Sequence, residues 1–199
     1  DFYTFSLYKT FGPHLGLLYG KYDILKSLPN QNHEFVKDEL PNTVLNPGGS
    51  NHELSACLVG VGEYFDNLYH HHFSEKSSNR RYKINSINKL INLYENKLGN
   101  TLIDFLLTKK NVKVIGKKEC KNKGRAPTIS FTLKNRSSKE ICDSLIKDNI
   151  GIRNGNFYAW RCLNTLGIEQ EDGVIRASMV HYNNVNEVEL LIKSLDKLI

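Results

Sequence analysis

The chain has 199 residues, of which 40% are hydrophobic and 24% charged, with a net charge of +6 at pH 7. This composition is typical of a folded globular protein and excludes a disordered chain. No apolar run approaches the roughly 20 residues of a membrane-spanning helix, so we expect no membrane partner. The four cysteines lie far apart without a C-x-x-C pair, which argues against disulfides and zinc and favours a reducing, cytoplasmic compartment.

The first 21 residues predict a strand, a loop and a second strand. Residues 1–6 alternate like a strand inside a sheet, and residues 17–19 are the apolar centre of the next one. The loop between them contains Lys9. A strand at the very first residue leads us to expect that the chain is part of a larger protein. Residues 22–49 contain several Pro and Gly breakers and are expected to be irregular.

Two helices are predicted next. Ser50 and Glu53 have the spacing of a capping box, and apolar residues follow at helical intervals as far as Leu68. Residues 74–83 are polar and are expected to form a loop. Residues 84–107 form a second, longer helical pattern, with Gly99 as a candidate interruption.

From residue 112 onward strands alternate with helices. Strands are predicted at 112–115, 128–133, 150–153 and 174–179, and helices are predicted after Ser137, at 157–166 and after Asn184. This pattern indicates a compact α+β domain of about 90 residues. We therefore divide the chain into residues 1–83, a connecting helix at 84–111 and a small domain at 112–199.

Three segments carry a family resemblance. They are residues 1–20 (DFYTFSLYKTFGPHLGLLYG), residues 46–53 (NPGGSNHE), and the arginine segments 151–155 (GIRNG) and 174–178 (VIRAS), the last followed by HYN at 181–183. Together and in this order they resemble the class V aminotransferase and cysteine-desulfurase-like family of fold-type-I pyridoxal-phosphate (PLP) enzymes. The resemblance covers almost the whole chain.

The resemblance implies an α/β fold that represents the C-terminal part of such an enzyme. The parts would be the end of the large-domain sheet with its helices, a long connecting helix, and a small α+β C-terminal domain. It also implies pyridoxal 5'-phosphate as cofactor, an amino-acid substrate, and a homodimer with active sites at the subunit interface. The family builds its site from both halves of the chain, so we expect this fragment to be poorly active alone.

Lys9 resembles the Schiff-base lysine of the family. A lysine amine condenses with the cofactor aldehyde and later carries a proton. Taken alone, a loop lysine is more often simply solvated. Ser6 lies where the family has a phosphate-binding hydroxyl, although a strand-end serine explains it equally well. Tyr8 stands where many relatives have histidine.

Gly49 and Ser50 precede a predicted helix, where backbone N–H groups attract phosphate. In the family this loop reaches the cofactor phosphate of the neighbouring subunit, often through a threonine. Gly49 occupies the threonine position, so the contact would come from the backbone or from Ser50. A plain helix cap is the alternative and is compatible with phosphate binding.

Arg176 resembles the family arginine that holds the substrate carboxylate, since a guanidinium matches a carboxylate bidentately. Arg153 lies in a segment that often also faces the active site. For Arg176 the alternative is a surface arginine at a strand end.

Tyr158 stands at the position of the nucleophilic cysteine in the R-x-G-x-x-C pattern of cysteine desulfurases. Sulfur transfer requires a thiolate, and Cys162, four residues later, is expected to be a packing residue. True cysteine desulfurase activity is therefore disfavoured. Transamination, β-elimination, racemisation and decarboxylation stay open.

Two functions from different classes remain. The first is a PLP-dependent enzyme part, and the second is a non-catalytic remnant that serves as a dimerisation or interaction module. The histidine run at 70–72 is interpreted as a polar helix end, since adjacent helical residues diverge, so no metal site is expected. Arg80 and Arg81 are accompanied by no array of stacking aromatic residues and no known nucleic-acid motif, so a solvated linker is favoured and no nucleic-acid partner is expected.

Overall fold

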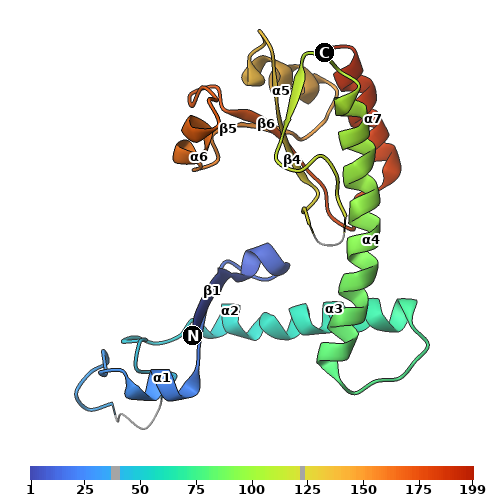
Figure 1. Cartoon of the computed structure of the whole chain (residues 1–199). Helices are drawn as coiled ribbons and strands as arrows, with labels where there is room; N and C mark the ends of the chain where they lie inside the picture. The colour runs from blue at the N-terminus through green and yellow to red at the C-terminus, as the bar shows by residue number, and fades with distance from the viewer. Residues whose placement is uncertain (37–40, 122–123) are drawn as a thin grey trace. The chain divides into compact units, whose positions relative to one another are not determined.

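The computed structural model describes residues 1–36, 41–121 and 124–199. The chain forms two compact units, residues 1–87 and 88–199, and each is described by itself (Figure 1). The division falls inside helix α4 (Arg80–Leu107), the element that we interpreted as a connecting helix. The three-part division derived from the sequence stays a prediction.

The first unit begins with an antiparallel hairpin. Strands β1 (Phe2–Ser6) and β2 (Gly16–Gly20) pair from Phe2 opposite Gly20 to Ser6 opposite Gly16. The connection contains one turn of 3-10 helix, η1 (Leu7–Thr10). The predicted order of strand, loop and strand is confirmed.

The segment at 22–49 was expected to be irregular, and for its first residues this was wrong. Helix α1 (Tyr22–Ser27) forms there and ends at Leu28, directly before Pro29. The residue before a proline is pushed out of the helical region, so this helix stops where the first breaker begins. Residues 37–40 of this segment lie outside the described residues.

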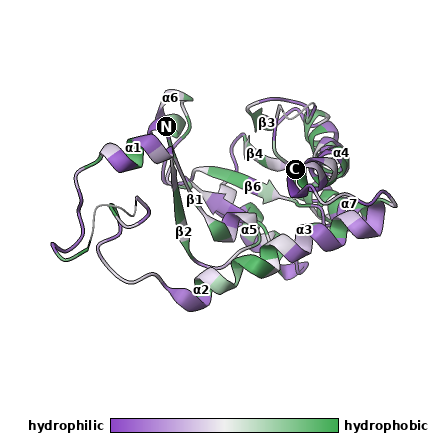
Figure 2. Ribbon diagram, turned by 90° about the horizontal axis from the view of Figure 1, so that it is seen from below, coloured by the Kyte–Doolittle hydropathy of each residue, from purple (hydrophilic) through white to green (hydrophobic). Residues whose placement is uncertain are grey.

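Helices α2 (His52–Ala56) and α3 (Leu58–His72) replace the single helix that was predicted from Ser50. Asn51 is the N-cap, and its side-chain oxygen accepts a hydrogen bond from the Leu54 amide at 2.8 Å. The predicted Ser50 capping box was therefore wrong by one residue, because asparagine caps a helix as well as serine does. The ribbon is hydrophilic at the start of α2, hydrophobic in the first part of α3 and hydrophilic again toward the end of α3 (Figure 2).

Helix α4 begins four residues earlier than predicted, at Arg80, and runs through Gly99 without a break. A Cβ at Gly99 would lie 2.6 Å from the sulfur of Cys120. Gly99 therefore allows the close approach of the Cys120 side chain and does not interrupt the helix.

The second unit contains a four-stranded antiparallel sheet in the order β3-β4-β6-β5. Strands β3 (Val112–Ile115) and β4 (Thr128–Leu133) have the predicted bounds, and β6 (Val174–Ser178) ends one residue early. Strand β5 (Arg153–Gly155) was predicted at 150–153, which was wrong. Ile152 instead belongs to the buried core just ahead of the strand.

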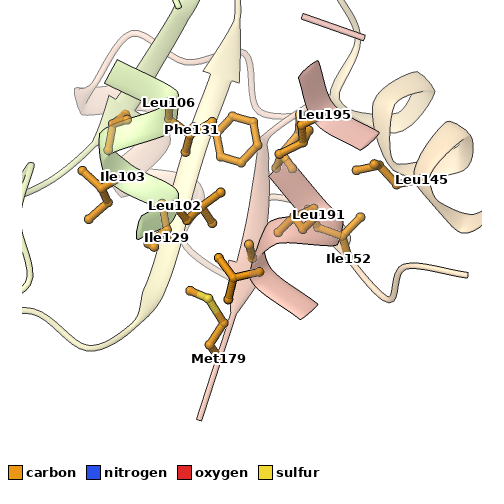
Figure 3. Packing of buried hydrophobic residues seen from close by; sticks show 14 of the residues in the cluster. Leu102, Ile103, Leu106, Ile129, Phe131, Leu145, Ile152, Met179, Leu191 and Leu195 are labelled. Carbon is orange, nitrogen blue, oxygen red and sulfur yellow. The ribbon is translucent and has the colours of Figure 1, made fainter. Parts of the chain in front are cut away.

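The core of this unit lies on one face of the sheet. Inward-facing residues pair across β4 and β6, with Ile129 opposite Ala177 and Phe131 opposite Ile175. Buried residues of α4, α5 (Ser138–Lys147) and α7 (Val185–Asp196) complete the cluster (Figure 3). Such apolar burial is the dominant favourable term in folding. None of the helices in the described part of the chain has the length and apolar character that a bilayer crossing requires.

Helices were also predicted after Ser137 and Asn184, and both residues are N-caps. Ser137 caps α5 by accepting from the Lys139 amide, and Asn184 with Glu187 forms a full capping box on α7. Because backbone and side-chain donors bind the Glu187 carboxylate, its pKa is lowered from the ordinary value. The remaining helix, α6 (Trp160–Thr165), is shorter than predicted and is followed by Gly167 at a φ of 66°.

A carboxylate that the sequence did not single out joins three segments of this unit. Asp172 accepts hydrogen bonds from the Ser137 hydroxyl at 2.8 Å and the Ser138 amide at 2.9 Å. The Ser138 hydroxyl in turn accepts a hydrogen bond from the amide of Asn154 in β5 at 3.1 Å. This network ties the start of α5 to β5 and to the loop that precedes β6.

We expect Asp172→Ala to lower the free energy of unfolding by about 2 kcal/mol, because it leaves buried donors around Ser138 without an acceptor. Urea denaturation followed by circular dichroism measures this. Asp143→Ala is the matched control, because Asp143 forms an exposed ion pair with Lys139 and should change stability by less than about 0.5 kcal/mol. Equal losses in the two variants would contradict the role of Asp172.

Candidate functional site

Lys9 lies in the last turn of η1, exposed, between β1 and β2. Two backbone hydrogen bonds of Leu7, whose side chain is buried, hold this turn. The Leu7 amide donates to the Leu15 carbonyl at 2.8 Å, and the Leu7 carbonyl accepts from the Gly12 amide at 2.9 Å. Lys9 is thus presented to solvent from a short loop whose two ends are hydrogen-bonded.

Phe11 anchors this loop to helix α3. Its backbone is left-handed, with a φ of 63°, and its ring lies 5.5 Å from the ring of Tyr64 and 6.2 Å from that of Phe65. Sequence reasoning did not identify Phe11. The signal that could have identified this residue is its aromatic side chain, placed between Lys9 and the Gly-Pro pair.

Gly12 is the residue that allows the loop to close. A Cβ at this position would lie 2.9 Å from the Leu7 oxygen and 3.0 Å from the Leu7 Cβ. Real Cβ atoms rarely approach so closely, so a larger residue would push the loop away from Leu7. The close approach to Leu7 therefore explains why position 12 is a glycine.

Tyr8 contacts both His14 and Lys9. Its ring lies edge-on to the His14 imidazole, with 4.8 Å between the ring centres, and the Lys9 ammonium lies 5.6 Å from the Tyr8 ring centre. The residue that stands where many relatives have histidine therefore offers an aromatic face to the lysine.

The predicted phosphate-binding residues fall in two places. Ser6 is half-buried at the end of β1, opposite Gly16. Gly49 and Ser50 are exposed and line an open cleft of about 620 Å³, whose other walls include β2 and residues 41–46. Neither Ser6 nor Lys9 lines this cleft. The structure therefore groups Ser6 with Lys9, and Gly49 with Ser50, but does not join the two pairs.

Arg176 and Arg153 are direct neighbours in the second unit. Arg176 lies in the middle of β6, opposite Arg153 of β5 on one side and Ser130 of β4 on the other. Side chains alternate along a strand, and Ile175 and Ala177 belong to the core. Arg176 therefore lies on the opposite face of the sheet, together with Ser130 and Arg153.

This pair of arginines has no carboxylate ion partner among the described residues. The Nε of Arg176 is buried and has no hydrogen-bond acceptor there. Like charges directly opposite each other on neighbouring strands are unfavourable. An anion bound between the two guanidinium groups would satisfy both their charge and their donors.

The loop after β5 has an unusual backbone. Phe157 and Tyr158 both have positive φ, 50° and 60°, and Tyr158 is fully exposed. Asn156 closes the turn, because its side-chain oxygen accepts from the Tyr158 amide and its carbonyl accepts from the Ala159 amide. The face of the Phe157 ring lies 3.6 Å from the Arg176 guanidinium carbon. Nothing in the sequence predicted this conformation.

The cysteines differ in exposure. Cys162 is exposed, so its interpretation as a packing residue was wrong, because helix α6 turns this position to solvent. Burial, followed by the charges of Asp143 and Asp172, raises the pKa of the Cys142 thiol to about 11, and burial also raises the pKa of Cys120. Both are poor nucleophiles. No group of three metal-ligating side chains occurs within the described ranges.

Comparison with known proteins decides the family. The model of the family described as aminotransferase class-V matches residues 83–191, which is more than half of the chain. The chain belongs to the aminotransferase class-V family. An aminotransferase-like protein of Gibberella zeae is 31% identical to this class V chain over all of it, and a cysteine desulfurase-like protein of Aspergillus flavus is 28% identical. The chain spans 46% and 42% of these proteins, about half of their length.

Solved structures confirm the predicted fold of this class V chain. A cysteine desulfurase from Thermococcus onnurineus matches all of it with a TM-score of 0.75, at 22% identity and over 47% of that protein. The cysteine desulfurase CsdA of Escherichia coli matches 99% of the chain with a TM-score of 0.73, at 22% identity and over 45% of that protein. The α/β fold is therefore that of part of a fold-type-I PLP-dependent transferase.

We expect Gly12→Ala to destabilise the lysine loop by about 1–3 kcal/mol, because the new methyl group would overlap the Leu7 backbone. Faster hydrogen exchange of the Leu7 and Gly12 amides reports this opening. Gly48→Ala is the control, since a Cβ there meets no atom within 4 Å. Unchanged protection of both amides in Gly12→Ala would show that the loop does not depend on this close approach.

Proposed function

We propose that this chain contributes the C-terminal half of the active site of a PLP-dependent enzyme that acts on an amino acid, and that Lys9 is the residue that binds the cofactor covalently. The observation that carries the proposal is the presentation of Lys9 on a hydrogen-bonded turn that requires glycine at position 12. A solvated surface lysine needs no such support.

The residues present fit the cofactor. Ser6 lies three residues before Lys9 and offers a hydroxyl to the phosphate, while Gly49 and Ser50 offer backbone and side-chain donors at the rim of an open cleft. When bound, pyridoxal phosphate supplies an electron sink for the substrate carbanion. The free Lys9 amine would accept and return a proton at the substrate α-carbon.

Arg176 and Arg153 are the proposed substrate-binding residues. The guanidinium of Arg176 presents planar, parallel donors that match a carboxylate, and its buried Nε has no acceptor among the described residues. Arg153, directly opposite, adds a second positive charge to the same face of the sheet. A substrate carboxylate would neutralise this pair.

The proposed assembly is a homodimer, in which Gly49 and Ser50 serve the cofactor phosphate of the second copy. This arrangement agrees with their position in a cleft that neither Lys9 nor Ser6 lines. The reaction class stays open among transamination, racemisation, β-elimination and decarboxylation. Sulfur transfer is disfavoured, because Tyr158 occupies the nucleophile position and a phenol does not accept sulfur as a thiolate does.

The alternative is a non-catalytic dimerisation or interaction module. It is favoured by Tyr158, which stands at the position of the nucleophilic cysteine of cysteine desulfurases. An interaction module does not need a lysine at position 9. The two proposed functions therefore differ in whether Lys9 is required.

We expect borohydride reduction in the presence of pyridoxal phosphate to attach the cofactor to Lys9, as read by peptide mass mapping. Lys9→Ala should abolish the labelled peptide and the visible absorption band of the bound cofactor. Lys26→Ala, an exposed lysine of α1, should change neither. The protein to test is the complete gene product that carries this chain.

A folded complete protein that shows no band, or that retains its band in Lys9→Ala, would refute the enzyme proposal and favour the interaction module. The same measurement on the 199-residue chain alone tests the expectation that half of the site is insufficient. Normal turnover by this chain would overturn that expectation.

We expect Arg176→Lys to raise KM for the amino-acid substrate about tenfold or more, since one lost bidentate contact is worth about 1.4 kcal/mol or more. The variant should leave turnover of the corresponding amine, which lacks the carboxylate, within about twofold. Arg161→Ala, an exposed arginine of α6, is the control. An equal effect on amino acid and amine would refute the carboxylate role.

A further inference from the structure

The Arg176 guanidinium packs against an aromatic ring. The guanidinium carbon lies 3.6 Å from the centre of the Phe157 ring, which is face-to-face contact distance. Guanidinium groups are attracted to aromatic faces both electrostatically and by stacking of the two planes. Phe157 is half-buried, so part of this contact is shielded from water.

Other interactions do little to fix the direction of Arg176. Its Nε has no acceptor among the described residues, and its cross-strand neighbour Arg153 repels it. Among the residues that the structure describes, no carboxylate forms an ion pair with Arg153 or Arg176. The Phe157 ring is thus the interaction that favours one plane for the guanidinium.

The backbone that brings Phe157 under the arginine is itself strained. Phe157 and the next residue, Tyr158, both adopt the left-handed conformation, which costs about 1–2 kcal/mol for each residue that has a side chain. Hydrogen bonds that Asn156 accepts from the Tyr158 and Ala159 amides close the turn. Strain of this kind persists where the surroundings require it, and it is frequent at functional sites.

We infer that Phe157 is a positioning residue for the carboxylate-binding arginine of this enzyme. The ring covers one face of the Arg176 guanidinium and leaves the edge donors free, so an incoming carboxylate binds in the guanidinium plane. This inference rests on the proposed role of Arg176 in substrate binding. It adds that the loop at 156–158 sets the direction from which the carboxylate binds.

The first test is structural and needs neither cofactor nor substrate. In ¹⁵N-arginine spectra of the chain, the Arg176 side-chain signals, assigned with Arg176→Lys, should be displaced upfield by the ring current of Phe157. Phe157→Leu should abolish this displacement, and Phe157→Tyr, which keeps the ring, should retain it. Signals that stay unchanged in Phe157→Leu overturn the inference.

The matched control for these spectra is Tyr158→Leu. It removes a ring from the neighbouring residue, which has the same left-handed backbone but is fully exposed. We expect the Arg176 signals to keep their displacement in this variant. Loss of the displacement in Tyr158→Leu would show that the turn as a whole, and not the Phe157 ring, holds the arginine.

The second test is kinetic and uses the complete enzyme. Phe157→Leu should raise KM for the amino acid about tenfold with kcat within about twofold, and Phe157→Tyr should restore the original KM. If Arg176→Lys raises KM but Phe157→Leu does not, the positioning role is refuted while the proposed function stands. If Arg176→Lys itself leaves KM unchanged, the carboxylate role proposed for Arg176 fails.

Discussion

Successive side chains of strand β6 point to opposite faces of the sheet, and only one of these faces packs against the core. The rest of the second unit depends on this constraint. Ile175 and Ala177 face Phe131 and Ile129 across the sheet and enter the core with them. Arg176, between them, must therefore face the other way. A one-residue slip of this strand would bury the guanidinium and expose the apolar pair, which is strongly unfavourable. The apolar core thus determines where the candidate carboxylate-binding arginine lies.

Strand β5, at the edge of the sheet, is too short for its pairing with β6 to fix its register. Contacts beyond this strand pairing fix the register instead. A Cβ at Gly173 would lie 2.2 Å from the carbonyl of Gly155, so the two backbones approach as only glycine permits. Asn154 bonds to the Ser138 hydroxyl, within the hydrogen-bond network around Asp172. These contacts hold Arg153 opposite Arg176, although the two charges repel. The stability of the second unit and the geometry of the candidate site therefore depend on the same residues.

The sequence predicted those elements that have a periodic apolar pattern or a recognisable helix cap. Strands β3 and β4 followed from alternation, and the α7 capping box followed from Asn184 and Glu187. The lysine loop followed from its family resemblance. Helix α1 was missed because six residues between breakers show little periodicity, and Asn51 was missed because Ser50 beside it is an equally good cap. The left-handed Phe157 has no sequence signature, since tertiary contacts override the preference of its side chain.

The loop at 156–158 places two neighbouring aromatic residues in different surroundings. In the resemblance, position 158 carries the thiol that receives sulfur, yet here it carries a fully exposed tyrosine. The left-handed backbone at Phe157 and Tyr158 forms in this chain without that thiol, so it does not depend on a cysteine here. The same turn brings the Phe157 ring against the Arg176 guanidinium. Under the role proposed for Arg176, positions 157 and 158 are therefore separable: the first bears on the orientation of the substrate carboxylate, and the second on the reaction that follows.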